Sequence, residues 1–137
     1  MLKVLIVDDS LIIRKKITKT IESLGHEVVF AAQNGAEAIE AFKTKQPDLV
    51  TMDITMPDMD GITAVKHIIS ESPDAKIIMV TSHGQEDMVI KSIQAGAVGY
   101  MLKPITEDKL IQSIGEVFPE YSQNGEEDDL DLLDDDY

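Results

Sequence analysis

The chain has 137 residues and no cysteine, so it has room for one domain and excludes disulfide frameworks, thiolate chemistry and cysteine-based zinc sites. Its hydrophobic fraction of 43% is that of a globular protein. Its net charge of −14 argues against nucleic-acid binding, because phosphate contacts need Lys and Arg.

Five short apolar runs recur along the chain. Most are too continuous for strands with one face in water, and they predict a parallel sheet covered on both faces. The first run is also too short for a signal-peptide core or a membrane span, so we expect a cytoplasmic protein without membrane insertion. The runs are residues 4–7, 28–31, 49–52, 77–80 and 100–102.

Apolar residues at helical spacing lie between these runs. Ile13, Ile17, Ile21 and Leu24 predict the first helix, and Gly25 supplies its stop signal. Five alternations of strand and helix predict a flavodoxin-like (βα)5 fold, a doubly wound parallel sheet with strand order 2-1-3-4-5. The other helices are predicted from Ala38, Ile39 and Phe42; from Ile62, Val65 and Ile69; from Val89, Ile93 and Ala97; and from Leu110, Ile114 and Val117.

Polar side chains follow four of the predicted strands, where open α/β sheets bind ligands. Asp8 and Asp9 follow the first strand and Asp53 follows the third, which would be its neighbour. Thr81 and Lys103 follow the fourth and fifth strands. Three carboxylates at one edge repel one another unless a cation joins them, and Mg²⁺ is a suitable ion with oxygen ligands.

Two interpretations of these residues compete. A single Asp at a strand end is more often a helix cap or a turn former, and Asp9 or Ser10 could be only that. The whole set is better explained by phosphoryl transfer. The carboxylate of Asp53 would attack phosphorus and become an acyl phosphate, Lys103 and the metal would neutralise charge, and Thr81 would donate its hydroxyl.

Four motifs in this sequence match a known family. They are Val7–Ser10, Met52–Gly61, Val80–Ser82 and Gly99–Pro104. On these motifs the chain resembles the receiver domains of two-component response regulators over residues 1–118. The acidic residues 119–137 fall outside the pattern and are expected to be a disordered tail.

The resemblance implies a role for each motif residue. It implies Asp53 as the phosphoacceptor and Asp8, Asp9, Asp53 and the backbone carbonyl of Thr55 as ligands of Mg²⁺. It also implies that Lys103 pairs with the phosphoryl group, beside a cis peptide to the following proline.

The resemblance also implies that two residues, Thr81 and Tyr100, act together as the conformational switch. Thr81 would move toward the phosphoryl group, and the ring of Tyr100 would then turn inward. This movement would reshape the face made by the fourth helix, the fifth strand and the fifth helix.

The resemblance also implies the class of partner. A domain of this kind receives its phosphoryl group from a histidine kinase and acts as a monomer on a motor-switch or phosphatase-type protein. Residues 48–57 look especially like chemotaxis regulators. A phosphorelay intermediate, which passes its phosphoryl group to a histidine phosphotransfer protein, is the alternative within the family. Thr55 and His83 occupy the variable positions that tune dephosphorylation.

One enzyme class also uses an aspartate nucleophile on an α/β sheet. Haloacid-dehalogenase-like phosphatases carry Asp-x-Asp on their first strand, whereas this chain has the adjacent pair Asp8 and Asp9 there. We therefore expect a phosphoacceptor switch and not a turnover enzyme.

The end of the chain carries most of the excess charge. Residues 120–137 contain nine acids and no base, whereas residues 1–119 contain 17 acids and 12 bases, a net of −5. Leu130, Leu132 and Leu133 interrupt the acids. Two interpretations stay open: a solubilising tail, or a segment that docks through Lys91 and Lys109 on the output face of the same protein or of a neighbouring copy.

Overall fold

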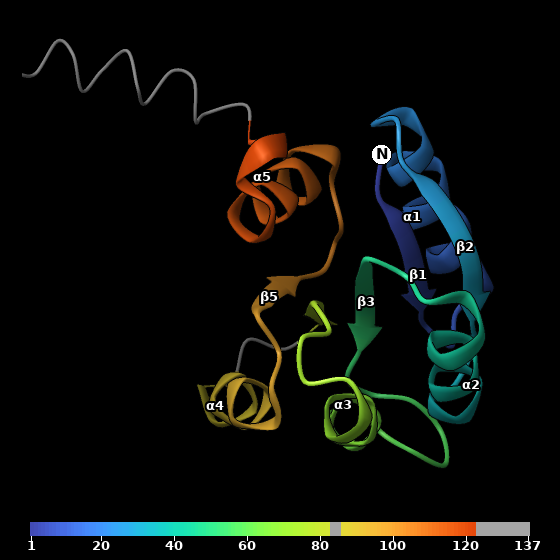
Figure 1. The fold of residues 1–137 in the computed structure, drawn as a ribbon, viewed down its shortest axis with the longest axis vertical. Helices are drawn as coiled ribbons and strands as arrows, with labels where there is room; N and C mark the ends of the chain where they lie inside the picture. Colours follow the sequence, from blue (N-terminus) through green and yellow to red (C-terminus); the bar gives the residue numbers. More distant parts are fainter. Residues whose placement is uncertain (83–85, 123–137) are drawn as a thin grey trace, which may run out of the picture.

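The computed structural model describes residues 1–82 and 86–122; His83 and the tail from residue 123 onward lie outside this part. Its strands form one parallel sheet in the order β2-β1-β3-β4-β5, which confirms the predicted flavodoxin-like fold (Figure 1). The strands are β1 (Lys3–Val7), β2 (Glu27–Ala32), β3 (Leu49–Asp53), β4 (Ile77–Thr81) and β5 (Gly99–Leu102). The helices are α1 (Leu11–Ser23), α2 (Gly35–Lys45), α3 (Gly61–Glu71), α4 (Glu86–Ala95), α5 (Glu107–Val117) and the short 3-10 helix η1 (Pro119–Tyr121).

The helices cover the sheet on both faces, with α2, α3 and α4 on one face and α1 and α5 on the other (Figure 1). Alternate residues of each strand point to opposite faces, as the pleat requires. On β1, for example, Leu5 packs under α2 and α3, whereas Val4 and Ile6 pack under α1 and α5. Two apolar cores therefore hold the strand ends in fixed relative positions.

The central strands and the edge strands differ in burial. Every residue of β3 and β4 is buried, as their continuous apolar runs predict. The edge strands β2 and β5 are partly exposed, and Phe30 on β2 is 40% exposed. Each edge strand has only one neighbouring strand, so part of its surface faces solvent.

Capping residues set the helix boundaries. Ser10, Asn34, Asp60 and Thr106 each accept a hydrogen bond from a backbone N–H in the first turn of the helix that follows. The prediction that Ala97 belongs to the fourth helix is wrong. Helix α4 ends at Ala95 because Gly96 adopts a φ of +116°, which a right-handed helix cannot continue.

The packed chain extends past residue 118. Helix η1 places Tyr121 against the α1/α5 core, where its hydroxyl accepts a hydrogen bond of 2.7 Å from the Met1 ammonium group. Its ring lies 4.9 Å from the ring of His26 in an edge-to-face arrangement. Among the helices described, none is long and apolar enough to cross a membrane.

Candidate functional site

Three carboxylates meet at the carboxyl edge of the sheet. Strand β1 pairs with β3, with Val7 opposite Met52, so the residues that follow β1 lie beside Asp53 at the end of β3. One carboxylate oxygen from each of Asp8, Asp9 and Asp53 lies within 4.8 Å of the others. Asp8 and Asp53 are buried and Asp9 is exposed, so one side of the cluster faces solvent.

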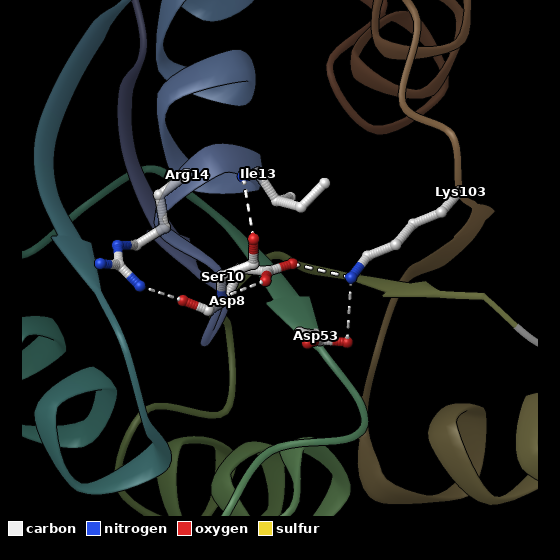
Figure 2. Close-up of polar contacts among 6 residues, drawn as sticks. All are labelled: Asp8, Ser10, Ile13, Arg14, Asp53 and Lys103. Atoms are coloured by element: carbon white, nitrogen blue, oxygen red, sulfur yellow. Dashed lines mark hydrogen bonds and ion pairs between the residues drawn. The ribbon is translucent and has the colours of Figure 1, made fainter.

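Asp8 is fixed by contacts on both carboxylate oxygens (Figure 2). Its Oδ1 accepts a hydrogen bond of 2.9 Å from the Ser10 N–H, and its Oδ2 lies 2.9 Å from Lys103 Nζ. The Asp8 carbonyl accepts a hydrogen bond of 2.7 Å from Arg14 Nη1. Ser10 itself caps α1 by accepting a hydrogen bond from the Ile13 N–H. Ser10 therefore is the helix cap that the sequence suggested, and its N–H also connects Asp8 to the start of α1.

Lys103 brings a positive charge into the cluster from the far edge of the sheet. Its ammonium group lies 2.9 Å from Asp8 Oδ2 and 3.6 Å from Asp53 Oδ1, and the peptide to Pro104 is cis, as the resemblance implied (Figure 2). Burial lowers the pKa of Lys103, but the two carboxylates outweigh burial and the net pKa is raised. The lysine therefore stays charged at the site.

Asp53 is the carboxyl group that the site perturbs most clearly. Burial is the largest cause and the Asp8 charge the next, and together they raise the pKa of Asp53 from 3.8 to about 6. Lys103 and a backbone hydrogen bond from Thr55 act in the opposite direction and offset only part of this. A second cation near Asp53 would therefore be favoured at neutral pH.

The loop after β3 approaches Asp53 so closely that only glycine fits. The Gly61 N–H donates a hydrogen bond of 2.7 Å to the Ile54 carbonyl, and a Cβ at Gly61 would collide with the backbone carbonyl of Asp53. The same loop carries Thr55, whose side chain is exposed. Gly61 thus sets the path of the segment that contains both Asp53 and Thr55.

Thr81 and Tyr100 lie at different levels of the sheet. Val80 is the β4 partner of Asp53, so Thr81 lies one residue beyond it toward the carboxyl edge, with its side chain buried. Tyr100 pairs with Met79, two residues before Thr81, and its half-buried ring packs against the α2/α3/α4 core. Burial raises the pKa of the Tyr100 hydroxyl.

Sequence reasoning missed two supporting residues. Arg14 binds the Asp8 carbonyl from within α1, and Gly61 was part of a motif without an assigned role. The helical spacing from Ser10 places Arg14 one turn into α1, which could have indicated its position. Nothing in the sequence pattern indicates which backbone atom approaches Gly61.

The donor set suits Mg²⁺. Magnesium prefers hard oxygen ligands and keeps several waters, so it is usually bound by one or two carboxylates and a phosphate. The cluster offers buried oxygens of Asp8 and Asp53 and the exposed carboxylate of Asp9, which leaves room for water and a phosphoryl group. Burial and the Asp8 charge raise the pKa of Asp53 despite Lys103, so a bound cation would favour the ionised carboxylate.

Comparison with known proteins agrees with this geometry. Residues 4–115 match the response regulator receiver domain. The chain is 49% identical to the chemotaxis protein CheY of Bacillus subtilis over 82% of its own length and 93% of that relative. It is 44% identical to CheY of Thermotoga maritima over 84% of its own length and 96% of that relative.

Comparison with solved structures also points to a CheY-like receiver domain. The fold superposes with a TM-score of 0.82 on a chain of the CheX-CheY-BeF3-Mg²⁺ complex from Borrelia burgdorferi, at 37% identity. That match covers 85% of this chain and 88% of the other. The matched family, the CheY relatives and the shared fold lead to one conclusion: this chain belongs to the response regulator receiver domain family.

Proposed function

We propose that the chain is a phosphorylation switch in which Asp53 accepts a phosphoryl group from a histidine kinase. The observation that carries the proposal is the environment of Asp53. Its buried carboxylate lies beside two other carboxylates and 3.6 Å from the Lys103 ammonium group. A lone structural Asp would not need this arrangement.

The transfer step follows from these positions. A carboxylate oxygen of Asp53 would attack the phosphorus of a phosphohistidine; the new P–O bond forms as the P–N bond breaks, and the imidazole leaves. Lys103 would hold charge that develops on the phosphoryl oxygens. Asp8, Asp9, Asp53 and the carbonyl of Thr55 would hold Mg²⁺, which supplies charge neutralisation for the transferring group.

The switch would be read on the face formed by α4, β5 and α5. Thr81 is buried at the end of the strand that pairs with β3, and its side chain would reach a phosphoryl group on Asp53. Tyr100, on the next strand, has a half-buried ring that a movement of Thr81 would allow to turn. Phosphorylation adds negative charge, which the arrangement with Thr81 moved toward the phosphoryl group would compensate better. It would therefore shift the equilibrium between the two arrangements of Thr81 and Tyr100 toward that one.

Chemotaxis is the pathway that the relatives support. The chain is similar to CheY proteins, and one similar structure is a complex of CheY with CheX. We propose a cytoplasmic monomer that acts on a motor-switch protein and is dephosphorylated with a phosphatase-type partner. The protein would be a switch and not an enzyme that turns over a substrate.

Intact-mass measurement tests the proposal. The full chain is incubated with Mg²⁺ and acetyl phosphate, and we expect a gain of one phosphoryl unit. Asp53→Asn should abolish the gain, whereas Asp74→Asn, at an exposed position before β4, should keep it. A chain that stays unmodified, or one that is modified equally after Asp53→Asn, would overturn the proposal.

A further inference from the structure

Positive charge in this acidic protein is concentrated on α1. That helix contains Arg14, Lys15, Lys16 and Lys19 and a single acid, Glu22. Helices α2 and α3 each have as many Lys as acidic residues, while α4 has a net charge of −1 and α5 of −2. Among the five α-helices described, α1 is therefore the one with a net positive charge.

The outward face of α1 is also apolar at its start. Leu11 is 55% exposed and Ile12 is 70% exposed, and the lysines follow one turn later. An open groove of about 430 Å³ runs beside this face. It is lined by Leu11, Arg14, Lys15, Thr18, Lys19 and, at its far end, Glu22 of α1, and by Ala31 of β2. The helix thus presents apolar side chains and cations along one line.

These lysines are available for a partner. Within residues 1–82 and 86–122, the ammonium groups of Lys15, Lys16 and Lys19 form no ion pair or hydrogen bond. By contrast, Lys109 on α5 donates hydrogen bonds to the carbonyls of Leu102 and Pro104, so it is already engaged on the proposed output face. Charge therefore directs an acidic ligand to α1 and away from the α4/β5/α5 face.

We propose that the acidic, leucine-containing segment 126–133 of the same chain docks on the outward face of α1. The segment contains five acids and no base, and its three leucines match the exposed apolar start of the helix. This assignment replaces the sequence-based hypothesis of docking through Lys91 and Lys109.

The position of Tyr121 and Ser122, from which the segment continues, lets segment 126–133 reach the outward face of α1. Tyr121 packs in the same apolar core as Leu24, the residue that caps the end of α1. Helix α1 has 13 residues and is about 20 Å long. The eight residue-to-residue steps from Ser122 to Leu130 span about 26 Å when extended. The segment can therefore run back along α1, with its first acids beside the lysines and its leucines beside Leu11 and Ile12.

Paramagnetic broadening in the full chain tests this docking. The chain has no cysteine, so a nitroxide can be attached only at Tyr137→Cys, a change that keeps every acid of the tail. We expect amide signals of the first turns of α1 to lose more intensity than those of α4 and α5. About 1 M salt, where the Debye length is only about 3 Å, should restore much of that intensity.

Reversing the charge of the α1 lysines, compared with reversing that of lysines elsewhere, tests whether the tail recognises α1. Lys15→Glu, Lys16→Glu and Lys19→Glu together should restore the α1 signals. The same reversal at three exposed lysines elsewhere, Lys45, Lys66 and Lys76, should leave the broadening in place. If the α1 variant fails to fold, changing Asp128, Asp129 and Asp131 to Asn gives the same test from the tail.

Specific outcomes would overturn the inference. Broadening centred on α4 and α5, uniform broadening, or no broadening would each contradict docking on α1. A mixture of isotope-labelled protein without nitroxide and unlabelled protein with nitroxide separates contacts within one chain from contacts between two. Broadening of the α1 signals in that mixture would assign the site to a neighbouring copy and contradict docking within one chain.

Discussion

The ammonium group of Lys103 lies 2.9 Å from Asp8 Oδ2 but 3.6 Å from Asp53 Oδ1. The lysine follows β5 and reaches Asp8 at the end of β1, across the ends of β4 and β3. It therefore compensates the buried carboxylate of Asp8 more closely than the proposed phosphoacceptor. A phosphoryl group on Asp53 would compete for the same cation, which links the chemistry of the site to its stability.

Lys103→Met should destabilise the metal-free protein, because it leaves the carboxylate of Asp8 buried without its cation. Removing one partner of a buried ion pair costs about 3 kcal/mol, so urea unfolding should show a loss of that order. Adding Mg²⁺ should reduce the difference in unfolding free energy between Lys103→Met and the original protein. Lys109→Met is the control, since it removes solvent-exposed hydrogen bonds of a half-buried side chain and should cost about 1 kcal/mol or less. Equal losses in the two variants would contradict the role assigned to Lys103.

Asp53→Asn should stabilise the metal-free protein at neutral pH. The pKa of Asp53 is raised to about 6 in the fold, above its ordinary 3.8, so the fold favours the protonated form. The stability that this group contributes is complete below about pH 4 and is lost as the pH rises through about 6. The variant avoids this loss.

The size of that effect can be measured by urea unfolding without metal. At about pH 7.5 we expect the variant to be more stable by about 3 kcal/mol, because the pKa shift from 3.8 to about 6 is converted at 1.36 kcal/mol for each pKa unit. At about pH 4 the two proteins should differ little. Mg²⁺ should stabilise the original protein more than the variant. A variant that is less stable at neutral pH would show that the Asp53 charge is compensated without metal.

The arrangement of the site was predictable because parallel strands end at one edge. Asp8, Asp53 and Lys103 each follow an apolar run, and the strand order brings those ends together. The contacts that hold them were not predictable in the same way. Gly61 meets a backbone atom, and His26 meets Tyr121 across 95 residues of sequence, so both contacts depend on how separate elements pack.

Gly61→Ala should weaken both the fold and metal binding. A Cβ at this position collides with the Asp53 carbonyl, and a backbone atom cannot move aside as a flexible side chain can. Overpacking of this kind costs about 1–3 kcal/mol, and the displaced loop carries Asp53 and Thr55. Mg²⁺ affinity, measured by titration calorimetry, should fall as well.

Gly99→Ala is the matched control for that change. A Cβ at Gly99 meets only Ile78 side-chain atoms at ordinary contact distances of 3.4 Å and more. The control should therefore keep Mg²⁺ affinity unchanged. If Gly61→Ala also bound Mg²⁺ normally, the loop would not depend on the close approach at Gly61.

Thr51→Val should stabilise the protein. Thr51 lies in the middle of β3 and is 1% exposed, and its hydroxyl has no hydrogen-bond partner among the residues described. A buried hydroxyl without a partner costs about 1–3 kcal/mol, and valine has nearly the same shape. We expect the free energy of unfolding to rise by about 1 kcal/mol. Thr44→Val on α2, where the exposed hydroxyl bonds the Glu40 carbonyl, should give no such gain. An unchanged or lower stability for Thr51→Val would mean that the hydroxyl is satisfied in solution, for example by a bound water.

His26 should make the fold sensitive to acid. Its Nδ1 accepts a hydrogen bond of 3.0 Å from the Leu2 N–H, which requires that nitrogen to be unprotonated. Burial first, and the nearby N-terminal ammonium group second, lower the pKa of His26 below 6.5. The fold thus favours the neutral ring, and the stability from this group is complete above about pH 6.5 and is lost as the pH falls through the lowered pKa.

The measurement must separate this effect from that of Asp53, which changes stability in the opposite sense over much of the same pH range. Urea unfolding is therefore compared in the Asp53→Asn background at several pH values. His26→Gln should reduce the loss of stability between about pH 7 and pH 5, because glutamine does not titrate. His67→Gln, which changes an exposed ring on α3, should leave the loss as it is. Protonation of His26 also removes the acceptor of the Leu2 N–H, so protection of the Leu2 amide, measured as its exchange rate relative to an unfolded chain at the same pH, should fall in acid. An acid-side loss that is the same with and without His26 would show that protonation elsewhere controls it.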